Sequence, residues 1–374
     1  MRVSPGLLCL VALAGPPALA GSGPNVVKHV VVYEEEGRFA GWPANHGAWS
    51  WGDEILVGFE LGRFRGSEEG HAIDYDEPAE HVLARSLDGG ETWTLERPPG
   101  LRPPPGEKVA GVPTGSGGRP LSDSPGGIDF SHPDFALTAR MTSIHDGVSR
   151  FYYSLDRGRS WQGPYRLPDF GQPGTAARTD YLVSGQHDLT LFLTVAKSDG
   201  KEGRVICART RDGGRSWSLE GFVTPEPEGR EYAIQPSSVR LDDGALLTAV
   251  RYRPYIDLFT SEDEGKSWER LSRPAPATGG NPPSLSRLRD GRLVLSYGYR
   301  EEPFGIRAVF SQDAGRSWSE PFVLRDDGGS WDLGYTRTVQ RPDGRLVTVY
   351  YYNLGADSER FIGATIWDPG SPAE

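Results

Sequence analysis

Residues 86–93 read SLDGGETW, and four more copies of this pattern follow along the chain. They are SLDRGRSW from Ser154, TRDGGRSW from Thr210, SEDEGKSW from Ser261 and SQDAGRSW from Ser311, with starts separated by 68, 56, 51 and 50 residues. Spacings of this size indicate a repeat architecture or a propeller. The pattern is typical of a hairpin turn, in which the Asp accepts backbone N–H groups, the Gly takes a positive φ and the Trp packs the turn onto its sheet. A turn that recurs in this way belongs to the scaffold.

Apolar runs of strand length fill the rest of each repeat. Examples are EILVGFEL, LTLFLTV, ALLTAVRY and RLVTVYYY, which are separated by turn signals such as DDG, RDG and PDG. Each repeat therefore predicts a four-stranded blade that ends in its box. The sixth repeat has no box, and VVKHVVVYE at residues 26–34 can supply its missing strand and close the ring. The sequence predicts an all-β fold, a six-bladed β-propeller over about residues 25–370.

The N-terminus has the pattern of a secretory signal peptide. Arg2 is followed by an apolar run from Leu7 to Ala14 and by the small-residue stretch PPALA, which ends at Ala20. We expect residues 1–20 to be removed and residues 21–374 to form one secreted or periplasmic domain. No other stretch approaches the roughly 20 apolar residues that span a bilayer. The mature chain keeps only Cys207, which we expect to be a buried strand residue without a disulfide partner.

Charge and composition limit the partners. The chain has 40 Lys and Arg against 51 Asp and Glu, a net charge of −11, and no basic block, so nucleic acid is excluded as a partner. The 7 His residues show no metal-binding spacing, so we expect no metal and no cofactor. The many Trp and Tyr residues suit a glycan ligand, and we expect a monomer.

The innermost strands of a propeller surround its axis, so polar residues at their entries are expected to meet at one mouth. The candidates, in blade order, are Trp42, Asn45, His46, His132, Asp134, Arg140, Arg178, Asp180, Tyr181, Gln235, Arg251, Asn281, Arg300, Arg307, Asp332, Tyr335 and Arg337. We expect His46 and His132 to hydrogen-bond a substrate there. A solvated structural channel is the other interpretation. The Pro/Gly-rich stretch at residues 102–130 is either a rim over this pocket or an insertion without a fixed structure.

With its five boxes and this strand order, the whole mature chain resembles the sialidase (neuraminidase) superfamily, and among it the bacterial secreted sialidase-like proteins. Members hold a substrate carboxylate with three arginines and use a Tyr nucleophile, a Glu that activates it and an Asp acid/base on a loop. The resemblance implies that Tyr335, in DLGYTRTVQRPDG, is the nucleophile. It also implies Arg251, Arg63 and either Arg300 or Arg307 as the arginines, and Asp74 or Asp76, in HAIDYDEP, as the acid/base.

Two positions depart from the superfamily pattern. The first arginine normally stands two residues before a Pro, but FAGWPAN has Gly41 there, and Arg38 lies five residues before Pro43. The usual Glu of blade four is replaced by Gln235, whose amide cannot accept the tyrosine proton. Glu231, Asp332 or Glu359 would then have to activate Tyr335.

Three functions therefore remain open. The first is an exo-glycosidase that removes a terminal acidic sugar, sialic acid or a relative. The second is a hydrolase for another glycan that uses water and two carboxylates such as Asp76 and Asp332. The third is a glycan-binding propeller without catalysis.

Overall fold

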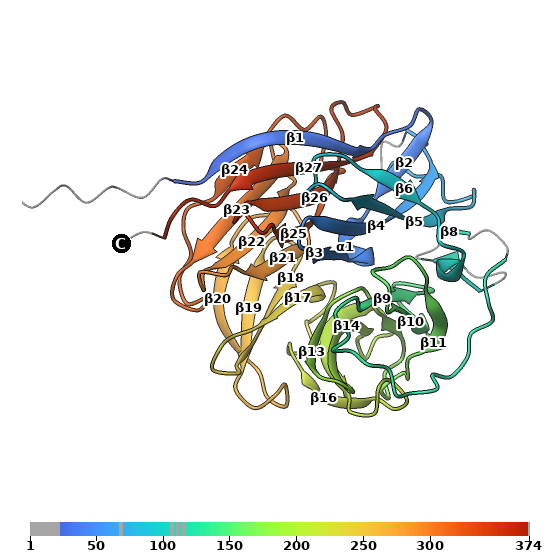
Figure 1. Cartoon of the computed structure of the whole chain (residues 1–374). Helices are drawn as coiled ribbons and strands as arrows, with labels where there is room; N and C mark the ends of the chain where they lie inside the picture. The colour runs from blue at the N-terminus through green and yellow to red at the C-terminus, as the bar shows by residue number, and fades with distance from the viewer. Residues whose placement is uncertain (1–22, 67–69, 105–107, 110–111, 114–116, 373–374) are drawn as a thin grey trace, which may run out of the picture.

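The computed structural model describes residues 23–66, 70–104, 108–109, 112–113 and 117–372. The predicted signal peptide, residues 1–20, lies outside these ranges, as do parts of the stretch 102–130. Within the described residues, six sheets form the blades of a propeller (Figure 1), so the predicted fold is confirmed. A separate hairpin joins β7 (Lys108–Val109) to β8 (Val112–Pro113). No helix in these ranges has the length and hydropathy that crossing a membrane would require.

The blades are antiparallel sheets, numbered here along the chain. Blade one contains β2 (Arg38–Gly41), β3 (Ala48–Trp51), β4 (Glu54–Arg63), β5 (Glu80–Ser86) and β6 (Thr94–Glu96). Blade two contains β9 (Ala136–Met141), β10 (Ser149–Ser154) and β11 (Gln162–Arg166). Blade three contains β12 (Thr175–Ala176), β13 (Tyr181–Gly185), β14 (Asp188–Ala196), β15 (Glu202–Thr210) and β16 (Ser218–Phe222).

The remaining blades have four strands each. Blade four contains β17 (Ile234–Arg240), β18 (Leu246–Arg251), β19 (Ile256–Ser261) and β20 (Glu269–Ala275). Blade five contains β21 (Pro283–Arg287), β22 (Leu293–Tyr299), β23 (Gly305–Ser311) and β24 (Phe322–Arg325). Blade six contains β25 (Gly334–Gln340), β26 (Leu346–Tyr352), β27 (Phe361–Asp368) and, from the other end of the chain, β1 (Asn25–Tyr33). The short helices are α1 (Pro43–His46) and the 3-10 turn η1 (Pro99–Leu101).

The N-terminal strand closes the ring, as the sequence predicts. β1 runs antiparallel to β27 (Figure 1), and the pairing extends from Asn25 opposite Asp368 to Tyr33 opposite Ile362. The apolar core lies between neighbouring blades: Ile55 and Val57 of β4 pack with Val347 and Val349 of β26. Because the first and last segments share blade six, the closure is held by backbone hydrogen bonds as well as by this core.

The five boxes form the turns between the third and fourth strands of their blades. In the first box, the Ser86 hydroxyl accepts the Gly90 N–H at 2.8 Å, and the Asp88 carboxylate accepts the Thr92 N–H at 2.9 Å. Gly90 has a φ of 91°, which a side chain would make costly. The other boxes repeat these bonds. The structural role predicted for the boxes is therefore confirmed.

The tryptophans of the boxes differ in burial, which gives a stability prediction. Trp161 is 3 % exposed, packs against Trp49 and donates its indole N–H to the Gly158 carbonyl at 2.9 Å. Trp217 is partly exposed, and its indole nitrogen has no hydrogen-bond partner within the part of the chain that the structure describes. We expect Trp161→Ala to lower the free energy of unfolding by about 3 to 5 kcal/mol and Trp217→Ala to lower it by less. Urea unfolding of both variants measures this difference. Equal losses would contradict the burial argument.

Blade two departs from the prediction of four strands. Within the described residues, β9 is the second strand of this blade and no strand pairs with its inner edge. Helix α1 and the segment before β13 pack there instead: the Thr138 hydroxyl donates to the His46 carbonyl at 2.9 Å, and the Ala139 N–H donates to the Thr179 hydroxyl at 3.1 Å. This packing brings α1 of blade one next to blade two.

Candidate functional site

A cavity of about 240 Å³ opens at the end of the propeller where the innermost strands begin. Its lining combines cationic, phenolic and apolar side chains from several blades: Trp42, Asn45, His71, Tyr75, Met141, Ile144, Arg178, Glu202, Tyr232, Ile234, Arg251 and Tyr335. We call this cavity the mouth. Its size and its convergent polar groups suit a ligand of one or two sugar rings.

Three residues at the mouth have backbone conformations that side chains rarely adopt. Trp42, Gln235 and Tyr335 have φ values of 59°, 51° and 52°. Hydrogen bonds hold two of them in place: the Tyr335 N–H donates to the Asn281 amide oxygen at 2.9 Å, and the Gln235 N–H donates to the Thr194 hydroxyl at 3.1 Å. Such strain clusters at functional sites, where the surroundings fix a side chain in a required direction.

Tyr335 lies in the wall of the mouth next to a guanidinium. Arg251 Nη1 donates to the phenol oxygen of Tyr335 at 3.2 Å and also to the amide oxygen of Gln235. Burial opposes ionisation of the phenol, but the positive charges of Arg251, Arg300 and Arg178 outweigh it, so the pKa of Tyr335 is lowered from its ordinary value. Tyr335 therefore gives up its proton more readily than an ordinary tyrosine.

The three arginines around Tyr335 are held in different ways. Arg178 forms an ion pair with Glu202 at 2.7 Å. Arg300 donates to the Gly280 and Leu333 carbonyls and, at 2.9 Å, to the Tyr351 phenol. Arg251 Nη2 donates to the Tyr232 phenol at 3.2 Å. Among the described residues, the buried Nε atoms of Arg251 and Arg178 both lack a hydrogen-bond partner, whereas Arg300 Nε donates to the Leu333 carbonyl. Arg251 and Arg178 therefore each have a buried donor left for an acidic ligand.

A histidine and an aspartate form a pair at the edge of the mouth. His71 Nδ1 lies 2.5 Å from Asp332 Oδ1, and the imidazole packs edge-on to Trp42. Asp332 also accepts hydrogen bonds from the Ala72 N–H, the Tyr351 phenol and Arg360. With Nδ1 bound to Asp332, the Nε2 atom of His71 is left for a ligand.

Burial and neighbouring charges shift the pKa values of His71 and Asp332 and so give the two residues different roles. Burial lowers the pKa of His71; the hydrogen bond to Asp332 raises it by less, and Arg300 and Arg251 lower it further. Burial alone would raise the pKa of Asp332, but its hydrogen bond with His71 and the charges of His71 and Arg360 hold it well below its ordinary range. Asp332 therefore stays ionised and orients His71, whereas His71 can exchange a proton below pH 6.5.

Of the five carboxylates predicted as acid/base or activating residues, Asp332 lies at the edge of the mouth beside His71, and the other four do not line the mouth. The loop that carries HAIDYDEP places His71 and Tyr75 in the mouth, but neither Asp74 nor Asp76, and the side chain of Asp76 is 90 % exposed beside Arg65. Glu231 is exposed and does not line the mouth, and Glu359 accepts the Gly37 N–H at 3.1 Å. The structure therefore does not bring Asp74 or Asp76 into the mouth as the acid/base, or Glu231 or Glu359 as the group that activates Tyr335.

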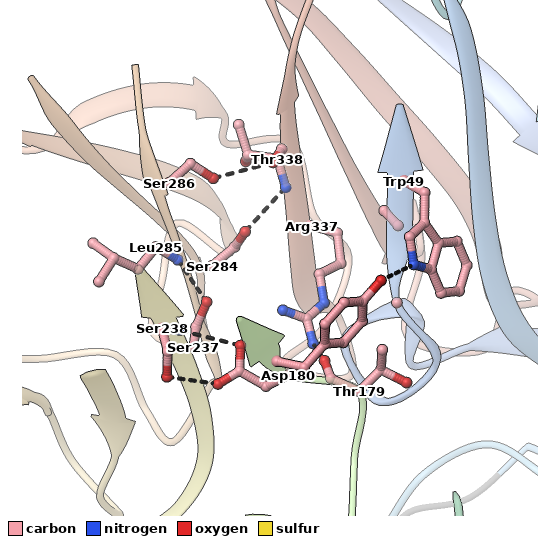
Figure 2. A pocket seen from close by; sticks show the side chains of 13 residues that line it. Trp49, Thr179, Asp180, Ser237, Ser238, Ser284, Leu285, Ser286, Arg337 and Thr338 are labelled. Carbon is pink, nitrogen blue, oxygen red and sulfur yellow. Dashed lines mark hydrogen bonds between the residues drawn. The ribbon is translucent and has the colours of Figure 1, made fainter. Parts of the chain in front are cut away.

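Other predicted mouth residues lie toward the opposite face of the propeller. Because β9 ends at the mouth with Met141, its start carries His132 and Asp134 to the far end, where Asp134 pairs with Arg157 of the second box at 2.5 Å. Asp180 lines the far opening, a cavity of about 180 Å³, and accepts the Ser238 hydroxyl at 2.7 Å (Figure 2).

Figure 2 shows the side chains that line this far opening. Side chains of Ser237 and Ser284 bond the backbones of Leu285 and Thr338 at 2.9 and 3.0 Å, so they link neighbouring inner strands. Arg337 spans the channel and donates to the Ala44 and Thr179 carbonyls. The far opening is thus a structural part of the channel, and these residues have no access to a ligand in the mouth.

Three further arginines do not reach the mouth. Arg63 is exposed at the end of β4 and pairs with Glu77 at 3.6 Å. Arg307 lies on β23, the third strand of its blade, and stacks on Tyr299. Arg140 and His46 are buried beneath the mouth. The two arginines that accompany Arg251 at Tyr335 are therefore Arg300 and Arg178, and the predicted role of Arg63 and Arg307 in this cluster is wrong.

Among the residues of the mouth that were not predicted are His71, Glu202 and Tyr232, whose sequence context gives little indication of a functional role. His71 begins the quoted loop, but the resemblance directed attention to its aspartates. Glu202 and Tyr232 lie in segments that were not assigned to the mouth, and only the fold brings them to Arg178 and Arg251.

One sequence family and several solved structures are similar to this chain. Residues 135–348 match the BNR repeat-like domain. No curated protein matches the sequence. Among solved structures, a Dyadobacter fermentans protein of unknown function has 21 % identity and a TM-score of 0.71, over 92 % of this chain and 99 % of that one.

Two glycosidase structures are also similar in fold. A sialidase from Streptococcus pneumoniae has 13 % identity and a TM-score of 0.61, over 90 % of this chain and 70 % of that one. An α-L-arabinofuranosidase from Fusarium graminearum has 14 % identity and a TM-score of 0.53, over 88 % and 96 %. Likeness at such identities supports the fold, while the domain match covers more than half of the chain. The protein therefore belongs to the BNR repeat-like domain family, and its fold is similar to the six-bladed propellers of sialidases.

Proposed function

We propose that the protein is an exo-glycosidase that removes a terminal acidic sugar, sialic acid or a relative, from a glycan. The observation that carries this proposal is the Tyr335 phenol in the wall of the mouth, 3.2 Å from Arg251 Nη1 and with its pKa lowered by three arginines. A tyrosine oxygen is a suitable nucleophile for an anomeric carbon that bears a carboxylate, because the three arginines around it offset the repulsion between the phenolate and the substrate carboxylate.

The substrate carboxylate is assigned to Arg251. Its buried Nε has no partner among the described residues, and burial of an unpaired donor is costly unless a ligand satisfies it. The Nε of Arg178, which also lines the mouth, is unpartnered in the same way and can serve as a second donor. Arg300 contributes charge at longer range, since its donors are bound to protein groups. Gln235 fixes the Arg251 guanidinium from one side and donates to the Asn45 amide oxygen at 3.0 Å on the other. Gln235 is therefore a positioning residue.

The reaction uses His71 for the proton. The Tyr335 phenolate oxygen forms a bond to the anomeric carbon as the glycosidic C–O bond breaks, and the leaving oxygen takes a proton from His71 Nε2. Water then attacks the anomeric carbon, its proton passes to His71, and the phenolate leaves. Asp332 holds the imidazole in place throughout through Nδ1.

The geometry favours this scheme over the two-carboxylate alternative. Asp332 already accepts hydrogen bonds from His71, Ala72, Tyr351 and Arg360, and Asp76 is 90 % exposed. Neither carboxylate is placed to activate water in the mouth. The glycan-binding propeller without catalysis remains an outcome of the assay below.

A panel of fluorogenic glycosides tests the substrate class. We expect turnover of glycosides of nonulosonic acids and no turnover of neutral arabinofuranosides or hexosides. The methyl ester of the best substrate, which lacks the charge that Arg251 would bind, should have a kcat/KM lower by about 10- to 100-fold, the value of one charge-assisted hydrogen bond. Turnover of a neutral glycoside only, or binding without turnover of any, would contradict the proposal.

We also propose that the protein is exported. The motive is the signal-peptide pattern that ends at Ala20. Mass spectrometry of the protein from its native host should find a mature N-terminus near Gly21 in the secreted or periplasmic fraction. An intact Met1 in the cytosolic fraction would contradict this expectation.

A further inference from the structure

Four buried polar side chains meet beneath the mouth, where blades one and two adjoin. They are His46 of α1, Glu60 of β4, His81 of β5 and Arg140 of β9, with exposures of 2 %, 2 %, 9 % and 3 %. We call them the buried polar cluster. Each has one atom without a hydrogen-bond partner among the described residues: His46 Nδ1, Glu60 Oε1, His81 Nε2 and Arg140 Nη2. Since buried polar atoms are almost always paired, four such atoms in one place indicate a small guest.

The protein leaves room for one small particle there. A cavity of about 10 Å³ lies against His46, Glu60 and Arg140, and it shares Asn45, Met141 and Arg178 with the lining of the mouth. A space of this size holds about one water-sized particle. The close approach of α1 to β4 requires Gly58, because a Cβ at that position would lie 2.8 Å from His46 Cβ. The backbone thus holds His46 over this space.

The donors and acceptors of the buried polar cluster indicate which kind of small ion or molecule fits as a guest. Arg140 Nε donates to His81 Nδ1 at 3.3 Å, so the neutral imidazole of His81 carries its proton on Nε2. The unpartnered atoms of Arg140 and His81 are therefore both donors. Burial raises the pKa of Glu60 to about 8, with Arg140 offsetting part of the effect, so its carboxyl is a hydroxyl donor at neutral pH. Three of the four side chains thus offer donors, so the guest must accept hydrogen bonds. The fourth atom, His46 Nδ1, can either accept or donate, since no hydrogen bond within the described residues fixes the tautomer of His46.

A metal ion fits this cluster less well than an anion. One ligand atom each from His46, Glu60 and His81 lie within 4.8 Å of one another, a donor set that zinc uses. However, the proton on His81 Nε2 occupies the position of a metal bond, and the buried guanidinium of Arg140 repels a cation. Among the described residues no carboxylate forms an ion pair with Arg140. The unbalanced charge is positive.

We propose that the buried polar cluster binds one small monovalent anion of halide size, held by Arg140 Nη2, His81 Nε2 and the Glu60 hydroxyl. The anion balances the charge of Arg140 and ties α1 to blades one and two. Since α1 carries Asn45 into the mouth, the bound anion also fixes one wall of the candidate site.

The test follows thermal unfolding at constant ionic strength while chloride or bromide replaces gluconate. We expect the midpoint temperature to rise by several degrees and to saturate, because only the folded protein has the site. Glu60→Gln keeps a donor at this position and should keep the halide effect, whereas Arg140→Gln should lose it. If the cluster held a metal ion instead, Glu60→Gln would remove a metal ligand and lower the midpoint temperature, and EDTA would lower the midpoint temperature of the parent protein.

A direct measurement covers the case in which the Arg140 variant does not fold. Crystals of the unchanged protein grown in sodium bromide should show an anomalous peak within hydrogen-bonding distance of Arg140 Nη2 and His81 Nε2. A halide-independent midpoint together with no anomalous peak would overturn the proposal and leave a buried water as the guest. Neither measurement depends on glycosidase activity, so the result stands apart from the proposed function.

Discussion

Tyr335→Phe is expected to lower kcat on the best acidic glycoside by about 10³-fold or more, with little change in substrate affinity. The variant removes the nucleophilic oxygen and keeps the aromatic ring, so it removes bond formation and leaves the shape of the mouth intact. Rate assays and calorimetric binding measurements, made on protein whose unfolding midpoint is checked, give the two quantities separately.

Tyr232→Phe is the matched control. The phenols of Tyr232 and Tyr335 each accept a hydrogen bond from the same guanidinium, Arg251, at the same distance of 3.2 Å. If Tyr335 only bound the substrate or Arg251, both variants would lose about 0.5 to 1.5 kcal/mol, or roughly tenfold in rate. Similar losses in the two variants would therefore show that Tyr335 is no nucleophile.

His71→Gln is expected to lower kcat/KM by about 10²- to 10⁴-fold, the usual contribution of general acid–base catalysis. Glutamine can still bond to Asp332, which limits damage to the network of Tyr351 and Arg360. Asp74→Asn and Asp76→Asn are the controls, because both carboxylates lie outside the lining of the mouth. We expect each to stay within about threefold of the parent. A large loss in either control, with activity retained in His71→Gln, would restore the acid/base assigned from the resemblance.

The pH profile gives a second test of His71. Because burial and nearby arginines lower the pKa of His71, the protonated acid is present below that pKa and is lost as the pH rises through it. The slope of log kcat/KM against pH should therefore decrease by one unit in the parent protein, along a limb of the profile whose midpoint lies below 6.5. His71→Gln should remove this limb. A limb that persists in the variant would assign the acid to another group.

The fold could be predicted from the sequence because its signals are local and repeated. The hydrogen bonds of each box form within eight residues. The sixth repeat lacked one strand, and the strand at residues 26–34 supplies it by pairing with β27. Blade two was predicted with four strands because the other repeats have them. Nothing local in the sequence shows that α1 and Thr179 replace the inner strand of that blade.

The site was less predictable because its contacts join distant segments. Tyr335 and Arg251 were found from their places at strand ends, and they meet across 84 residues. His71 was missed because its role depends on Asp332, which lies 261 residues away. His132 and Asp134 were placed at the mouth because the direction of β9 along the axis cannot be derived from one strand alone. Strand direction and long-range pairing therefore decided which polar residues reach the mouth.

The most direct test of the account is to trap the covalent intermediate. An acidic sugar with fluoride as the leaving group at the anomeric carbon and a second fluorine on the adjacent carbon should react with the enzyme and then hydrolyse slowly, since the second fluorine destabilises the positively charged transition state. Peptide mass spectrometry should then find the sugar mass on the peptide that contains Tyr335, and no adduct in Tyr335→Phe. An enzyme that turns over acidic glycosides but forms no adduct, or forms it on another residue, would contradict the assignment of Tyr335 as the nucleophile.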